Sequence, residues 1–166
     1  MSLNIRRQLT LFIDDQQSQD IEDIRKRYNP AQFRLIRSHV TLCREHELEN
    51  LDQIKENIKS LHLGSIFIHL DRVVRFSDGK GVMIAADEIN PGYHHLRQLV
   101  LKNLGFEIKF PLPHLTLMHP RNSTCTDQIF CEINKINIPE TLFFTEISLI
   151  EQKEDSEWKI LETFKI

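Results

Sequence analysis

Hydrophobic and polar residues follow two different periods along the first half of the chain. Strict alternation over a short segment is typical of a half-buried strand, whereas apolar residues three or four positions apart are typical of an amphipathic helix. The alternating segments predict strands over residues 8–14, 39–42 and 65–76. The helical spacing predicts helices over residues 21–28, stopped by an Asn-Pro pair, and 48–61, ended by a glycine.

The second half repeats this order of elements. Residues 77–81 have the composition of a hairpin turn, and a strand is predicted to follow over residues 82–87. Asn90 is the candidate N-cap of the next helix, which has Pro91 at its first position and Gly105 past its end. The remaining predicted elements are a strand over 114–117, a helix over 129–136 capped by Thr124 or Thr126, and closing strands over 141–151 and 157–165.

A His-x-Thr-Leu tetrapeptide occurs twice, each time on a predicted strand. The two copies are His39-Val40-Thr41-Leu42 and His114-Leu115-Thr116-Leu117. The strand before each copy lies at a similar distance, because Thr10 precedes Thr41 by 31 residues and Met83 precedes Thr116 by 33. The chain therefore divides into two similar halves, approximately residues 1–78 and 79–166. From this order we predict one α+β domain with two lobes that face a shared cleft.

Alternation along a strand gives each tetrapeptide two different faces. His39 and Thr41 project to one side, whereas Val40 and Leu42 project to the other. The second copy has the same arrangement, so each strand has an apolar face for the core and a polar face. An imidazole exchanges a proton near neutral pH, and a threonine hydroxyl can donate to a phosphate oxygen. Each strand is therefore a candidate half of a phosphate-handling site.

The paired motif resembles that of a known superfamily. Two His-x-Thr-hydrophobic motifs about 75 residues apart, in a chain of 166 residues, are similar to those of the 2H phosphoesterases, and most of all to the 2′-5′ RNA ligase or RNA 2′,3′-cyclic phosphodiesterase branch. The resemblance implies a bilobal, pseudo-two-fold α+β fold, with two antiparallel sheets lining a central cleft and helices packed outside. It also implies hydrolysis of cyclic phosphodiesters at a ribose 2′ position without a metal or other cofactor, and 2′-5′ RNA ligation as a related activity. The expected partner is a nucleotide or RNA terminus bearing a cyclic or 2′-linked phosphate.

Carried over to this chain, the resemblance assigns roles to the four motif residues. His39 and His114 match the catalytic histidines, and Thr41 and Thr116 match the phosphate-binding threonines. The assignment makes His39 the proton donor and His114 the proton acceptor in hydrolysis. Proton transfer by each imidazole typically contributes about 10²–10⁴ in rate.

Residues near the motifs are further candidates for the site. An arginine five residues after a motif histidine is common in the family; Arg44 fills that place in the first copy, whereas His119 fills it in the second. Arg121 follows two residues later, so Arg44 and Arg121 are the candidate basic contacts to phosphate. A continuous strand would place His114 and His119 on opposite faces. The candidates for stacking a nucleobase are the aromatic residues Phe76 and Tyr93.

Composition limits the class of protein. A hydrophobic fraction of 40% and a charged fraction of 27% are those of an ordinary globular protein, and no window approaches the roughly 18 apolar residues of a membrane helix. The three cysteines are odd in number and lack C-x-x-C spacing, so the sequence supports neither a disulfide framework nor a zinc ribbon, and we expect a reducing cytoplasm. A net charge of −3 disfavours binding of long nucleic acids through the overall field but allows a local basic site. We expect a cytoplasmic monomer with no membrane association and no obligate protein partner.

Two other functions are compatible with the same residues. A non-catalytic module of the same fold would bind a nucleotide or RNA end and use the motifs for phosphate contact alone. A zinc hydrolase is the second alternative, although His94 and His95 point apart on their predicted helix and the remaining histidines lack ligand spacing. Turnover of 2′,3′-cyclic mononucleotides, its loss on substitution of either motif histidine, and its response to chelators would distinguish the three.

Overall fold

The computed structural model describes residues 3–86, 88 and 90–166. Its first half contains, in chain order, β1 (Ile5–Phe12), α1 (Asp15–Tyr28), α2 (Pro30–Leu35), β2 (His39–Cys43), η1 (Glu45–Glu47), α3 (Leu51–Lys59) and β3 (Ile66–Arg75). Its second half contains β4 (Val82–Ala86), α4 (Pro91–Val100), β5 (His114–Met118), α5 (Asp127–Ile133), β6 (Thr141–Phe144), β7 (Glu146–Lys153) and β8 (Lys159–Lys165). The chain thus has the α+β character and the order of elements that the two periods predict.

All eight strands belong to one curled antiparallel sheet in the order β6-β3-β4-β5-β2-β1-β7-β8. The expectation of two separate sheets is therefore wrong. The two motif strands, β2 and β5, lie side by side in the middle and pair through Val40 and Leu115. This short pairing, at a single position, joins two four-stranded halves into one sheet. The strand pattern alone does not specify which edges meet.

The two motif strands occupy equivalent positions in two β-helix-β units, β1-α1-α2-β2 and β4-α4-β5. Thr10 lies opposite Thr41 in the first unit, and Met83 lies opposite Thr116 in the second. These are the residues whose similar spacings, 31 and 33, indicated two similar halves. Each unit also has a register shift at the same place, between Leu9 and Thr10 and between Val82 and Met83. The structure therefore repeats even a local irregularity of the sheet, which is strong evidence of pseudo-two-fold symmetry.

The apolar faces of the motif strands lie in the core. Val40, Leu42, Leu115 and Leu117 are at most 1% exposed, whereas the histidine and threonine of each copy are half-buried.

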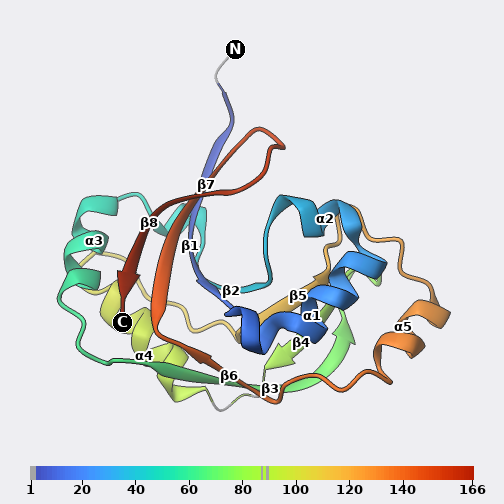
Figure 1. The fold of residues 1–166 in the computed structure, drawn as a ribbon. Coiled ribbons are helices and arrows are strands. Elements are labelled where there is room, and N and C mark those ends of the chain that lie inside the picture. Colours follow the sequence, from blue (N-terminus) through green and yellow to red (C-terminus); the bar gives the residue numbers. More distant parts are fainter. Residues whose placement is uncertain (1–2, 87, 89) are drawn as a thin grey trace.

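Helices α1, α2 and α5 gather on one side of the molecule and α3 and α4 on the other (Figure 1). Helix α1 contacts β5, and α4 contacts β2, so the helix of each unit packs against the motif strand of the other. Among the described helices, none has the length and apolar character needed to cross a membrane.

Two elements differ from the predicted ones. The short helix α2 begins at Pro30, which was expected only to stop α1. A proline is tolerated at the first position of a helix because the N–H of that residue has no partner within the helix. The segment 141–151, predicted as one strand, is two strands, since β6 pairs with β3 whereas β7 pairs with β1 and β8. Thr126 caps α5 as expected, accepting from the Ile129 N–H. The predicted end of the fourth strand, Asp87, lies outside the described residues.

Candidate active site

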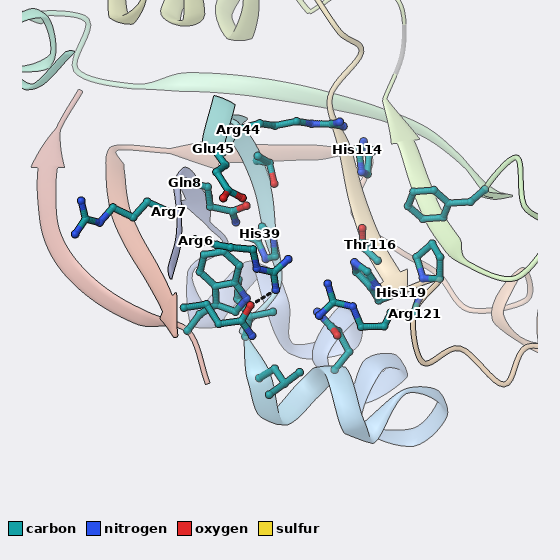
Figure 2. Close-up of a pocket in the computed structure, with 18 of the residues that line it drawn as sticks. Arg6, Arg7, Gln8, His39, Arg44, Glu45, His114, Thr116, His119 and Arg121 are labelled. Atoms are coloured by element: carbon teal, nitrogen blue, oxygen red, sulfur yellow. Dashed lines mark hydrogen bonds between the residues drawn. The ribbon is translucent and has the colours of Figure 1, made fainter. Parts of the chain in front are cut away.

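One cavity of about 450 Å³ is lined by both tetrapeptides. It lies where β2 and β5 meet, and Figure 2 shows side chains of the first motif facing those of the second across it. Seven of the eight predicted site residues line this cavity: His39, Thr41, Arg44, Phe76, His114, Thr116 and Arg121. The structure therefore brings together two imidazoles and two hydroxyls from opposite halves of the chain, as expected from the two-lobed order of elements.

The imidazole of His39 is held by a backbone carbonyl. Its Nδ1 lies 2.8 Å from the Arg37 carbonyl oxygen, and since a carbonyl only accepts, Nδ1 carries the proton. The other ring nitrogen, Nε2, is then free for chemistry in the neutral ring. Phe12, opposite His39 in the sheet, contacts the imidazole edge to face at 6.0 Å between ring centroids. The ring is thus fixed in both tautomer and orientation.

Burial makes the His39 imidazole a weak base. Removal from water lowers the pKa of His39 to about 4, although the hydrogen bond to Arg37 opposes this shift. Positive charge on Arg25, His114 and His119 lowers it further. Both motif histidines line the same cavity, so a positive charge on the His114 ring disfavours a positive charge on the His39 ring. At neutral pH His39 is therefore uncharged in the ligand-free protein.

His114 has a matching environment. Burial lowers the pKa of His114, the Arg44 guanidinium lowers it further, and a hydrogen bond to the Leu112 backbone opposes both. Leu112 stands two residues before His114, as Arg37 stands two residues before His39. An aromatic edge contact also recurs, because the Phe76 ring lies 5.5 Å from the His114 ring at an angle of 89°. Each imidazole is thus held by a hydrogen bond to the backbone two residues upstream and by an edge contact with an aromatic ring.

The cavity is strongly cationic although the whole chain is acidic. Five arginines line it, and Glu45 is the one acidic residue among the lining side chains. Three of these arginines already have carboxylate partners, in the pairs Arg7–Glu151, Arg25–Glu22 and Arg121–Asp155. Arg44 has no such ion pair within the described residues, and Figure 2 shows it reaching from the end of β2 toward His114. This distribution of charge favours an anionic ligand between the motifs.

His119 lies in the cavity, which corrects the prediction that it faces away from His114. Strand β5 is not regular: the register shift between Val82 and Met83 skips Leu117, so Leu117 and Met118 are both buried in succession. One extra residue in a strand reverses the alternation beyond it. His119 therefore returns to the cavity side, and the equivalent shift in β2 does the same for Arg44. The equal five-residue offset from each motif histidine was the signal for this equivalence.

Tyr93 does not line this cavity, so the expectation that it stacks a base is wrong. It is 2% exposed within the hydrophobic core, and its hydroxyl donates to the Thr41 carbonyl at 2.9 Å. The residue stands on the core-facing side of α4, where a helix must bury its apolar stripe. Its contribution is to hold β2 from behind rather than to meet a ligand.

A buried arginine completes the support of the first motif strand. Arg97 of α4, which is 2% exposed, donates to the Leu42 carbonyl, to the Lys109 carbonyl at 3.0 Å and to Glu47 at 2.6 Å. Glu47 in turn accepts from the Arg44 N–H at 2.8 Å. The end of β2, and with it the start of the Arg44 side chain, is therefore fixed by a helix from the other unit.

The second motif strand has an equivalent anchor on α1 and its C-cap. Asn29, which is buried, accepts from the His119 N–H at 2.9 Å and donates to the Asn122 side chain at 3.0 Å. Arg25, one turn earlier, donates to the Ile36 carbonyl at 2.7 Å, just before β2. Both motif strands are thus held by buried polar groups whose hydrogen bonds cross from one unit to the other.

Sequence reasoning did not identify several further residues that line the cavity. Arg6, Gln8 and Trp158 come from β1 and from the segment that leads into β8. They belong to no motif and lie far from both tetrapeptides in sequence, so only the pairing of β1 with β2 and β7 brings them to the site. In the part of the chain that the structure describes, no group of three or more His, Cys, Asp or Glu side chains is arranged to hold a metal ion.

The fold and the cavity define a class of protein: an α+β scaffold in which two equivalent strands each bring an imidazole and a hydroxyl into one cationic cavity. The chain belongs to the 2′-5′ RNA ligase superfamily, whose family model matches residues 13–156. This confirms the resemblance to the 2H phosphoesterases. The comparison with curated proteins gave no match.

Solved structures of similar fold extend over the whole chain. E. coli LigT complexed with phosphate is 16% identical, with a TM-score of 0.62 and 99% of each chain covered. E. coli LigT complexed with 3′-AMP is 15% identical, with a TM-score of 0.62 and 98% of each chain covered. A protein described as a phosphoesterase is 16% identical, with a TM-score of 0.65, covering 98% of this chain and 99% of that one. At these identities the likeness is one of fold.

Proposed function

We propose that this protein is a phosphodiesterase that opens 2′,3′-cyclic phosphates, or related 2′-linked phosphodiesters, of RNA ends or nucleotides by two-histidine acid–base catalysis. The observation that carries the proposal is the paired imidazoles of His39 and His114, which line one cationic cavity and are each held by the backbone two residues upstream. Membership of the 2′-5′ RNA ligase superfamily supports the substrate class. The binding of phosphate and of 3′-AMP by E. coli LigT, a protein of similar fold, is consistent with it.

Hydrolysis requires two proton transfers on opposite sides of the phosphorus atom. Water attacks phosphorus and forms a new P–O bond, while His114 accepts the proton that the water loses. The bond from phosphorus to one ribose oxygen breaks, and His39 donates a proton to that oxygen as it leaves. The product is a phosphomonoester and a free hydroxyl, and both imidazoles have exchanged their protonation states. The same steps with a ribose 5′-hydroxyl in place of water as the attacking group would open the cyclic phosphate into a 2′-5′ linkage, and their reverse would cleave that linkage with the two histidines exchanging roles.

The substrate itself supplies the protonation state that this scheme needs. In the ligand-free protein, burial and nearby cations lower the pKa values of both histidines and so favour the neutral rings. A phosphate anion between them favours the charged form of an imidazole and raises its pKa. With the substrate bound, one imidazole therefore keeps the proton that it donates to the leaving oxygen. Without the substrate, the neutral form of both rings is favoured.

The remaining predicted residues have roles in holding the phosphate. The hydroxyls of Thr41 and Thr116 share the cavity face with the imidazoles and can donate to the equatorial oxygens. Arg44, exposed and directed toward His114, supplies formal charge from the first motif, and Arg121 supplies it from the second. Phe76, beside His114, is the aromatic surface for a base on that side of the phosphate.

The test is turnover of 2′,3′-cyclic mononucleotides by the purified protein, with products resolved as 2′- or 3′-phosphates. His39→Ala and His114→Ala should each lower kcat by about 10²–10⁴, the usual contribution of one proton transfer. His62→Ala is the matched control, since His62 is exposed and outside the cavity. Activity should persist in EDTA. Binding of the nucleotides without turnover would instead identify a non-catalytic module.

A further inference from the structure

The cavity extends beyond the two motifs toward the hairpin between β7 and β8. This end is bounded by the indole of Trp158, the guanidinium of Arg6 and the side chains of Leu35 and Ile36. It lies on the side of His39, because Figure 2 shows Arg6 beside His39 and across the cavity from His114. Phe76 contacts His114 at the other side, so this second aromatic surface is a separate feature of the cavity.

The indole and the guanidinium are held in place before any ligand binds. The Arg6 guanidinium carbon lies 5.4 Å from the centre of the Trp158 ring, which is a cation–π contact. The backbone N–H of Trp158 donates to the Leu35 carbonyl at 2.9 Å. Gln152, which is 1% exposed, accepts from Arg6 and donates to the Ser156 carbonyl at 2.6 Å, so one buried amide fixes both the arginine and the hairpin.

The chemistry of this end suits an aromatic heterocycle better than a second phosphate. Its walls combine an indole and a guanidinium plane with apolar side chains, and such surfaces stack bases. Two glutamines line the same cavity, and each has polar groups for a base edge that make no hydrogen bond among the described residues. Gln8 donates to the Thr10 hydroxyl, which leaves its amide oxygen, and Gln32 accepts from Asn122, which leaves its amide hydrogens.

We propose that the Arg6–Trp158 pair is a nucleobase subsite on the His39 side of the phosphate. This proposal rests on the proposed function for the position of the phosphate, and it adds the part of the substrate that the motifs do not contact. The consequence is that a ligand bearing a base and a phosphate together is preferred over phosphate alone. A substrate with a base on only the Phe76 side would leave Trp158 without a role.

The chain contains a single tryptophan, so its intrinsic fluorescence reports on this subsite alone. Adenosine 3′-phosphate should quench the emission of Trp158 on binding, because a stacked base lies against the indole. Inorganic phosphate and 1,4-anhydroribitol 3-phosphate, which lacks only the base, should bind without comparable quenching. Affinities measured by calorimetry then give the contribution of the base independently of the optical signal.

Substitution separates stacking from a structural role. Trp158→Ala should weaken binding of adenosine 3′-phosphate roughly 5- to 150-fold, the range expected for loss of one stacked base, and leave phosphate affinity unchanged. Trp158→Phe should keep most of the affinity, since the aromatic face remains. Phe67→Ala is the control, because Phe67 is 53% exposed and outside the cavity.

Each outcome decides between the two proposals. Base-selective binding without turnover supports the subsite and refutes the enzyme. Turnover with equal quenching by base-bearing and base-free ligands refutes the subsite and leaves the enzyme intact. An unchanged nucleotide affinity in Trp158→Ala, or an equal loss for phosphate, overturns the subsite as well. Absence of binding by all three ligands overturns both.

Discussion

The protonation of His39 is predicted to depend on whether an anion occupies the cavity. In the free protein, burial lowers the pKa of His39 from 6.5 to about 4, which corresponds to about 3 kcal/mol in favour of the neutral ring. An anionic charge about 4 Å away contributes roughly 4 kcal/mol in the opposite direction at the effective dielectric of a protein surface. The second effect offsets the first, so the pKa of His39 should rise to near 6.5 or above when an anion is bound.

Sulfate is the suitable probe for this prediction, because its charge does not change over the relevant pH range. The His39 ring signals should be followed by NMR between pH 3.5 and 8, without and with saturating sulfate. The free protein should titrate with a midpoint near 4 and the complex with a midpoint at least 2 units higher, on the order-of-magnitude reasoning above. The ring signals of His62, exposed and outside the cavity, should not respond to sulfate.

The coupling between proton uptake and sulfate binding gives a second measurement of the pKa shift of His39. Between the free and the bound pKa of His39, each sulfate that binds takes up one proton, so its affinity rises about tenfold for each unit of falling pH. Calorimetry in buffers of different ionisation enthalpy would detect the proton uptake. The reasoning is refuted by a free midpoint near 6.5, which would mean that burial does not act on His39. It is also refuted by a midpoint that saturating sulfate leaves unmoved.

Three other outcomes follow from the contacts around the cavity. The free energy of unfolding should decrease as the pH falls from 6.5 toward 4, because the unfolded chain protonates His39 and the folded chain does not; His39→Gln should flatten this dependence in urea titrations. Arg97→Met should destabilise the fold by about 3–5 kcal/mol, since it leaves the half-buried Glu47 carboxylate and the Leu42 and Lys109 carbonyls without their hydrogen-bond donor. Lys59→Met, which breaks an ion pair that is exposed on both sides, should cost less than about 1 kcal/mol in the same assay. Asp155→Asn should free Arg121 and tighten sulfate binding up to about fivefold at low salt, as expected for one exposed ion pair. An unchanged sulfate affinity in that variant would show that Arg121 does not contact the anion.

The residues of the two tetrapeptides could be placed from sequence because their arrangement depends on local geometry. Alternation alone determines that His39 shares a face with Thr41 and that Val40 belongs to the core, and the burial of each residue agrees. The similar spacings of Thr10 to Thr41 and of Met83 to Thr116 likewise indicate two strand–helix–strand units of similar length. Such inferences need no knowledge of how distant segments pack.

The remaining features depend on contacts that a single sequence does not encode in any short pattern. His119 was misplaced because a one-residue irregularity in β5 reverses the alternation, and no residue type in that segment marks it. Tyr93 was misplaced because its direction is set by how α4 rotates onto β2. Trp158 was not identified because the β7–β8 hairpin reaches the cavity only through the pairing of β7 with β1.

The near-symmetry of the two motif strands bears on how one site can supply both an acid and a base. Each imidazole is fixed in the same way, so neither motif by itself specifies a role. Positive charge on His114 lowers the pKa of His39, which means that two protonated rings disfavour each other. An anion between them favours protonation of at least one ring. Together these two effects favour the state with a single proton shared by the pair, and this is the state that one donation and one acceptance require. Under the proposed function, the difference between donor and acceptor then comes from the flanking charges, Arg25 and His119 near His39 and Arg44 near His114. Arg44→Gln should therefore move the pH profile of kcat as well as lower its maximum, whereas loss of a contact that only binds phosphate would lower affinity without moving it.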